Sequence, residues 1–319
     1  MMKANALAEA IRRIRVGDTP MLQLPKALLA ALGIDACRAL VKDERQNPTG
    51  TLKARTARAM LLQAAEDEKL RPTTTVIEAS SGSTAVAEAY VAGQVGLRCM
   101  FFVPNSISAN KITRILAFGN AEVQRVEGSS EDARAAAEAW VTTHPELDLY
   151  YVDQYTNTAN PAAHILTTGP EILAQTQRLE MIIAGLGTGG TTCGLKQYFD
   201  GTGVRIVGVQ PDRKVHRIDG LKHFPSLAPQ EVPRVAALHL LDDIVFVSSD
   251  EAHEMVRMMS RHGLEFGPSS GAVLAALVQL CQRKGAPVGQ VVLVYPDDLG
   301  RYVTKYSDLL EEKTAAVVV

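Results

Sequence analysis

Lys53 is the residue whose chemistry stands out first, because it follows a Pro-Thr-Gly turn in the stretch "QNPTGTLKAR" at positions 46–55. Thr51 suits a helix N-cap and residues 52–65 contain no Gly or Pro, so the sequence predicts a helix there. Arg55 and Arg58 fall on another side of this helix. Lys53 heads its apolar stripe, which helical spacing assigns to Ala57, Met60, Leu61 and Ala64.

An amine held against apolar surface near a helix start is favoured in its neutral, nucleophilic form, because burial and the positive end of the helix dipole both disfavour the charge. Neutral amines form Schiff bases with aldehydes, and Lys53 is therefore a candidate for that chemistry. The alternative is that Lys53 extends from the first turn into water, as most helix lysines do.

A turn of small hydroxyl residues lies between a predicted strand and a predicted helix in "VIEASSGSTAVAEAYVA". Backbone N–H groups and the dipole at such a helix start favour a carboxylate or a phosphate. The alternative is a well-capped helix that binds nothing. The hydroxyl residues of this turn are Ser80, Ser81, Ser83 and Thr84.

A second turn, in "MIIAGLGTGGTTCGLKQYF", is rich in glycine and again separates a predicted strand from a predicted helix. Successive N–H groups can surround a phosphate here, and the residues concerned are Gly187, Thr188, Gly189, Gly190 and Thr191. Gly185, Gly187 and Gly190 also satisfy G-x-G-x-x-G, with Asp212 at a suitable distance, which makes a nicotinamide dehydrogenase an alternative. That alternative leaves Lys53 and the serine turn without a role.

Composition limits the function classes. The chain of 319 residues is 46% hydrophobic with a formal charge of −2, which is typical of a globular protein of two domains and not of a nucleic-acid binder. Its four cysteines lie far apart, which argues against a zinc site or a disulfide framework. The N-terminus lacks the apolar core of a secretory signal and no stretch reaches membrane-spanning length, so we expect a cytoplasmic protein.

Strand-like runs alternate with helical patterns along most of the chain, which predicts an α/β fold with parallel sheets. The alternation stops at about residues 221–241, where three prolines and no clean period predict a long functional loop. The predicted strands are "TTTVIEAS", "LRCMFFVP", "AEVQRVEG", "LDLYYVDQ", "MIIAGLG", "VRIVGVQP", "DDIVFVSS" and "QVVLVYPD".

Five ordered motifs, "NPTGTLKAR", "EASSGSTA", "QYTNTANPAAHILTTGPEI", "GTGGT" and "GPSSGA", resemble the cysteine synthase branch of the fold-type II pyridoxal-phosphate enzymes. The branch includes O-acetylserine sulfhydrylases and cystathionine β-synthases, and the resemblance runs from about Gly17 to Tyr302. It implies a homodimer whose subunits have two three-layer αβα domains with pyridoxal phosphate in the cleft between them. The expected domains are a smaller one at 46–152 and a larger one formed by 1–45 and 153–319.

The resemblance also implies roles for single residues. Lys53 matches the lysine that binds the cofactor covalently, and Ser269 matches the serine at the pyridine nitrogen. The cofactor phosphate is expected at Gly187, Thr188, Gly189, Gly190 and Thr191. The substrate carboxylate is expected at Ser80, Ser81, Gly82, Thr84 and Gln154.

The implied reaction is replacement of the β-substituent of O-acetyl-L-serine, or a related activated serine, by sulfide through an aminoacrylate to give L-cysteine. Ser83 stands where sulfhydrylases usually have an Asn at the cofactor ring, and "ASSGSTA" is closer to a cysteine desulfhydrase group. Desulfhydration of L-cysteine is therefore the close alternative, and an inactive homologue that binds a partner is a remote one. Asp297 and Asp298 in "PDDLGRY" depart from the family pattern and receive no role.

Overall fold

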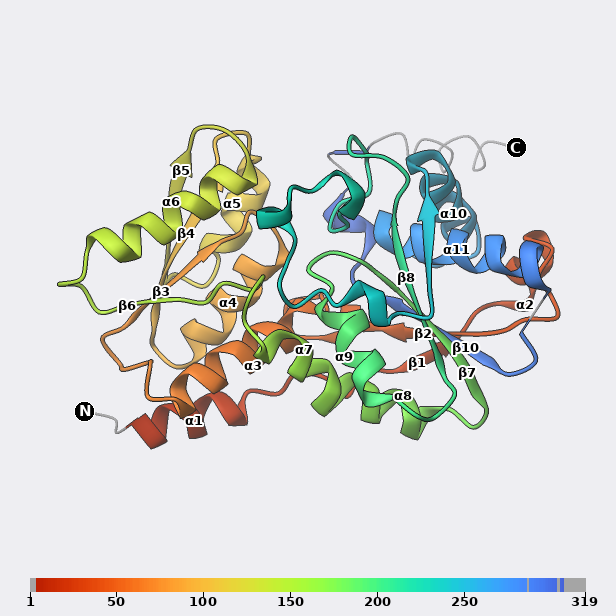
Figure 1. Cartoon of the computed structure of the whole chain (residues 1–319), viewed down its shortest axis with the longest axis horizontal. Helices are drawn as coiled ribbons and strands as arrows, with labels where there is room; N and C mark the ends of the chain where they lie inside the picture. Colours follow the sequence, from red (N-terminus) through yellow and green to blue (C-terminus); the bar gives the residue numbers. More distant parts are fainter. Residues whose placement is uncertain (1–3, 286, 303–304, 307–319) are drawn as a thin grey trace. The chain divides into compact units, whose positions relative to one another are not determined.

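Parallel strands organise the chain into two separate sheets (Figure 1), as described by a computed structural model of residues 4–285, 287–302 and 305–306. Each sheet belongs to its own compact unit. The first unit comprises residues 1–17 and 47–163, and the second comprises residues 18–46 and 164–319. This division differs from the predicted domains at residues 1–17 and 153–163, which group with the unit that contains Lys53, and at Gln46, which groups with the other unit.

The sheet of the first unit has four parallel strands in the order β5-β4-β3-β6. Neighbouring residues of β3 face opposite sides, so Val76 packs in the core beneath α3 and α4, whereas Ile77 packs in the core beneath α6. The elements are α1 (Ala4–Arg13), α3 (Lys53–Glu66), β3 (Thr75–Ala79), α4 (Ser83–Gln94), β4 (Arg98–Pro104), α5 (Ala109–Leu116), β5 (Ala121–Val126), α6 (Ser130–Thr143), β6 (Leu149–Tyr151) and α7 (Ala159–Ala163).

The sheet of the second unit has six strands in the order β1-β2-β10-β7-β8-β9, of which only the edge strand β1 is antiparallel. Helix α11 packs against β7, β8, β9 and β10. The elements are β1 (Met21–Gln23), α2 (Lys26–Ala31), β2 (Arg38–Asp43), η2 (His164–Thr168), α8 (Gly169–Gln175), β7 (Leu179–Gly185), α9 (Gly190–Tyr198), β8 (Arg205–Pro211), β9 (Asp243–Val247), α10 (Ser249–Arg261), α11 (Pro268–Lys284) and β10 (Gln290–Tyr295).

The structure confirms the α/β class and all eight predicted strands. It also confirms the long loop, because residues 213–242 contain only three short 3-10 turns, η3 (Phe224–Ser226), η4 (Pro229–Glu231) and η5 (Leu238–Leu240). The sequence did not predict β1 or β2. The C-terminal segment "EEKTAAVVV" lies outside the described residues.

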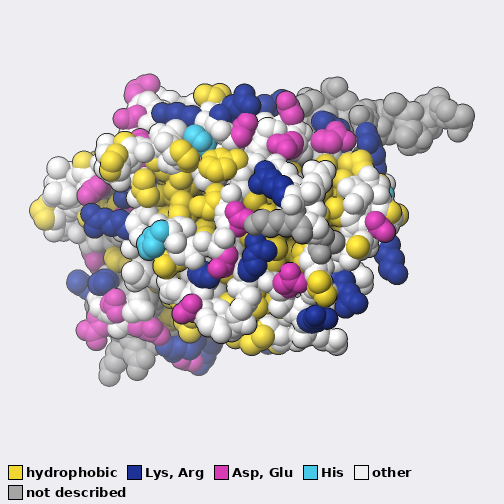
Figure 2. Space-filling model, turned by 45° about the vertical axis from the view of Figure 1, so that its right-hand side comes forward, with side chains coloured by type: hydrophobic (Ala, Val, Ile, Leu, Met, Phe, Trp, Pro, Cys, Tyr) yellow, Lys and Arg dark blue, Asp and Glu magenta, His cyan; other side chains and the backbone are white. Residues whose placement is uncertain are grey.

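Charged side chains of both signs are interspersed over the face shown in Figure 2, in line with the formal charge of −2. Among the described helices, none combines the length and the apolar character that a membrane span requires. All four cysteines are free thiols, and three of them are buried.

Candidate active site

Lys53 is the first residue of α3 and is half-buried. Its backbone N–H donates to the Thr51 hydroxyl at 3.2 Å, but the N-cap residue of this helix is Leu52, which caps no N–H group with its side chain, and not Thr51 as predicted. The stripe that Lys53 heads is fully buried, which confirms the predicted face: Ala57, Met60, Leu61 and Ala64. Arg55, predicted on another side of the helix, is also buried, with a relative exposure of 1%. The helix start is therefore enclosed on more sides than helical spacing indicated.

The serine turn leads into α4 without a side-chain cap. Gly82 is the N-cap residue, so it offers no side chain to the first N–H groups of the helix. The Ser80 hydroxyl accepts a hydrogen bond from the Gly82 N–H at 3.3 Å and does not reach into the helix. This arrangement contradicts the alternative of a helix capped by its own side chains. An anion is the natural partner of such a helix start.

Gln154 is buried beside the first turn of α4. Its Oε1 accepts a hydrogen bond from the Thr84 hydroxyl at 2.8 Å. The oxygen of the side-chain amide is thereby occupied, which leaves the amide N–H donors of Nε2 for another group. Donors of this kind suit a carboxylate. The first unit thus brings Thr84 and Gln154 together as the sequence predicts.

The glycine turn before α9 has space for backbone only. Gly189 is the N-cap residue in the left-handed region, with φ 83°, and no side chain caps this helix. A Cβ at Gly187 would lie 2.5 Å from the carbonyl oxygen of Gly220, and one at Gly189 would lie 2.7 Å from Cβ of Ala236. Only glycine fits these positions, because atoms closer than about 3 Å overlap. The uncapped N–H groups form the second candidate anion site.

His164 is a site residue that sequence reasoning missed. Its Nε2 lies 3.2 Å from the Thr191 hydroxyl, and its Nδ1 lies 2.9 Å from the Thr168 hydroxyl. It is fully buried at the start of the π-helical turn η2. The only signal in the sequence was its position at the end of "QYTNTANPAAH", where a histidine by itself indicates no particular role.

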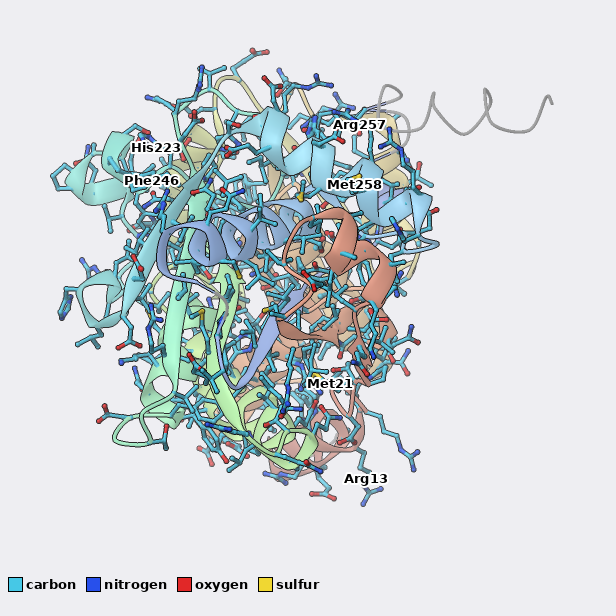
Figure 3. The ribbon with its side chains drawn as sticks, turned by 90° about the vertical axis from the view of Figure 1, so that its right-hand side faces the viewer. Arg13, Met21, His223, Phe246, Arg257 and Met258 are labelled. Carbon is cyan, nitrogen blue, oxygen red and sulfur yellow. The ribbon has the colours of Figure 1, made fainter. Side chains whose placement is uncertain are left out.

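The long predicted loop lies against the glycine turn. The Lys222 N–H donates to the Leu186 carbonyl at 2.8 Å, and the Ala237 N–H donates to Sγ of Cys193 at 3.2 Å. His223, the residue after Lys222, lies next to Phe246 of β9 (Figure 3), and their ring centroids are 6.3 Å apart. The loop is therefore bonded both to the residue before the glycine turn and to helix α9, which follows the turn.

Ser269 lies in the first turn of α11, where it is buried. The hydroxyl of its neighbour Ser270 is also buried and has no hydrogen-bond partner among the described residues.

Asp212, the acid of the dehydrogenase alternative, forms an ion pair with the adjacent Arg213 at 2.7 Å. That pairing occupies the carboxylate that a ribose would need.

Asp297, which received no role from the sequence, is buried next to the start of α11. Its Oδ2 accepts a hydrogen bond from the Tyr302 hydroxyl at 2.6 Å, and its backbone carbonyl accepts one from the Gly267 N–H at 3.2 Å. Its Oδ1 has no partner among the described residues. Burial raises the pKa of Asp297 from 3.8 to about 6, although the bond from Tyr302 opposes the shift.

Asp297→Asn should therefore change how stability depends on pH. A raised carboxyl pKa means that the folded state holds its proton longer than the unfolded state, so the free energy of unfolding falls as the pH rises from about 4 to about 6. An asparagine keeps an acceptor for Tyr302 and removes this loss, which amounts to about 3 kcal/mol. Urea unfolding at several pH values should show that the free energy of unfolding of the variant rises relative to that of the parent between about pH 4 and about pH 6. If the difference between the two free energies did not vary with pH, the prediction would be contradicted.

This chain is similar to known proteins over most of its length. The family model described as "Pyridoxal-phosphate dependent enzyme" matches residues 13–297. The chain is 34% identical over 299 residues to a cysteine synthase of Aquifex aeolicus (strain VF5), and this match covers 91% of this chain and 89% of that protein. It is 30% identical over 325 residues to cysteine synthase A of Escherichia coli, covering 94% of this chain and 96% of that protein.

Two solved structures are similar over nearly the whole chain. O-ureido-L-serine synthase has a TM-score of 0.81 at 28% identity, covering 95% of this chain and 94% of that one. O-Acetyl Serine Sulfhydrylase isoform 3 from Entamoeba histolytica has a TM-score of 0.83 at 25% identity, covering 95% of this chain and 91% of that one. The resemblance found in the five sequence motifs thus extends to sequence identity and to three-dimensional structure.

Proposed function

Because the chain belongs to the cysteine synthase branch of the pyridoxal-phosphate dependent enzymes, we propose that it replaces the β-substituent of an activated serine by sulfide to give L-cysteine. The leaving group is acetate when the substrate is O-acetyl-L-serine, and it departs with the electron pair of the Cβ–O bond. Sulfide then supplies the sulfur. Relatives that are cysteine synthases, together with the sulfhydrylase and synthase structures, support a small activated serine as the substrate.

The residues of the second unit fit the phosphate of the cofactor. The start of α9 presents uncapped N–H groups, and a Cβ at Gly187 or Gly189 would fill the space beside them. The residues that would hold the phosphate are Gly187, Thr188, Gly189, Gly190 and Thr191. Ser269 would face the pyridine nitrogen and Ser83 the ring oxygen. The proposed cofactor lysine and the proposed substrate residues belong to the first unit, and the proposed phosphate residues belong to the second.

Pyridoxal phosphate, when bound, withdraws electrons from the α-carbon of an amino acid and so weakens its C–H bond. Lys53 is the proposed attachment point and the base that takes this proton, because it carries an amine at the start of α3, at the head of the buried stripe. The α-carboxylate would bind the start of α4 at Ser80, Ser81, Gly82 and Thr84, together with the Nε2 group of Gln154. These contacts would orient the α-proton toward Lys53.

One observation carries the proposal: the start of α4, which no side chain caps, lies beside a glutamine whose amide oxygen is already occupied by Thr84. A carboxylate satisfies both groups at once, and an amino acid supplies one. Both groups lie in the first unit and point to the same kind of ligand.

The decisive experiment follows cofactor absorbance and sulfide after O-acetyl-L-serine or L-cysteine is added separately. We expect a rapid spectral change with O-acetyl-L-serine, and L-cysteine formation once sulfide is present. Ser83 favours a second candidate, L-cysteine desulfhydrase, which would release sulfide, pyruvate and ammonia from L-cysteine. Sulfide release without synthesis would establish that candidate. No response to either amino acid would contradict both reactions.

We also propose a homodimer in the cytoplasm, on the basis of the family resemblance. Size-exclusion chromatography with light scattering would test the dimer.

A further inference from the structure

Glu78 is a buried acid that ties two segments of the first unit together. It lies at the end of β3 with a relative exposure of 0%, on the sheet face covered by α3 and α4. Its Oε1 accepts a hydrogen bond from the Ala79 N–H at 2.7 Å, and its Oε2 accepts one from the Gln154 N–H at 3.1 Å. One carboxyl group therefore fixes the strand end that leads into the serine turn and also the backbone of Gln154.

Hydrogen bonds also hold the carbonyl oxygen and the side-chain oxygen of Gln154. Its carbonyl oxygen accepts from Nδ2 of Asn160 at 2.8 Å, and its Oε1 accepts from Thr84 at 2.8 Å. In the described part of the chain, Nε2 of Gln154 has no hydrogen-bond partner. The network built on Glu78 thus fixes the position of Gln154 and leaves the N–H donors of its Nε2 group unused.

We propose that Glu78 is a positioning residue for the α-carboxylate of the substrate, acting through the backbone of Gln154 and of Ala79. This inference rests on the proposed function. Glu78 differs from other buried acids in that both of its oxygens accept hydrogen bonds from the backbone, one on each segment. These bonds hold Gln154 Nε2 and the first N–H groups of α4 in one arrangement, and preorganised donors bind an anion without a cost of reorganisation.

Glu88 provides a matched control within the same core. It lies on α4, is also fully buried, and neither of its carboxyl oxygens has a hydrogen-bond partner among the described residues. Burial raises the pKa of Glu88 well above its ordinary value and raises that of Glu78 to about 8, so the change of acid to amide alters little charge at either position. Glu88→Gln makes the same chemical change without touching Gln154.

Glu78→Gln replaces one of the two acceptor oxygens by an NH₂ group, which must then face the N–H of Ala79 or of Gln154. The test titrates the holoenzyme with L-alanine and with ethylamine, which is alanine without its carboxylate, and follows the cofactor absorbance. We expect Glu78→Gln to weaken L-alanine binding by about 10-fold or more and ethylamine binding by less than about 2-fold. Glu88→Gln should change neither.

Two further variants keep the test decisive. Glu78→Asp retains both acceptor oxygens on a shorter side chain, so it should give a smaller loss that is again confined to L-alanine. In a Gln154→Ala background, Glu78→Gln should add little further loss, because the two residues act as one unit. If the losses of L-alanine affinity in the two single variants added fully in the double variant, Glu78 would not act through Gln154.

Three results would overturn the inference: unchanged L-alanine affinity in Glu78→Gln, an equal loss for both ligands, or the same loss in Glu88→Gln. These outcomes differ from a failure of the proposed function. That failure would appear in the unmodified holoenzyme as no spectral response to L-alanine or to O-acetyl-L-serine.

Discussion

Lys53→Ala is expected to abolish both turnover and covalent attachment of the cofactor. The amine is positioned by the first turn of α3 above the buried stripe, and no neighbouring residue of that turn offers another. Loss of a positioned base costs about 10²- to 10⁴-fold, and loss of the attachment point adds to this effect. Borohydride reduction followed by mass spectrometry should show the cofactor on residue 53 of the parent and on no residue of the variant.

Lys69→Ala is a suitable control because Lys69 is exposed and pairs with Asp67 at 3.0 Å. This variant should keep parental activity and covalent labelling at Lys53. Measurable labelling of another residue in Lys53→Ala, with activity retained, would show that Lys53 is not the attachment point.

Gly187→Ala is expected to reduce cofactor affinity by about 10- to 100-fold, which corresponds to the 1–3 kcal/mol that overpacking costs. The added Cβ would lie 2.5 Å from the Gly220 carbonyl oxygen, and a backbone atom cannot rotate away as a side chain can. Either the glycine turn or the loop at Gly220 must shift, and both changes disturb the N–H groups before α9. Equilibrium binding of pyridoxal phosphate to the apoenzyme would measure the loss.

Gly300→Ala is its control in the same unit. Gly300 is exposed, and the nearest atom to an added Cβ is Oδ1 of the Asp298 side chain at 3.1 Å. The cofactor affinity of this variant should equal that of the parent. If Gly187→Ala bound the cofactor as tightly as Gly300→Ala, the glycine turn would not be the phosphate site.

The sequence predicted the strands that are rich in Val and Ile and failed for β2, "RALVKD", which lies inside the second sheet. Lys42 and Asp43 give this segment a charged end, which is untypical of an inner strand, yet both are buried. The ammonium group of Lys42 lies 2.6 Å from a carboxylate oxygen of Glu171, a residue far along the chain. Burial of a charge depends on such a distant partner, which periodicity within one segment cannot reveal.

The same reason explains which parts of the site were predictable. Lys53, the serine turn and the glycine turn are local patterns, because a helix start and its preceding turn are adjacent in sequence. Glu78 acts on Gln154 and His164 acts on Thr191, and each pair is separated by many residues. Their roles follow from pairs of atoms that only the folded chain brings together.

His164 bridges two hydroxyl groups, with one ring nitrogen near each. In a neutral imidazole one nitrogen donates and the other accepts, so the choice of tautomer decides whether the hydrogen of the Thr191 hydroxyl points at the ring or away from it. The position of a single proton on this buried ring would thereby set whether the glycine turn offers an anion one donor more or one fewer.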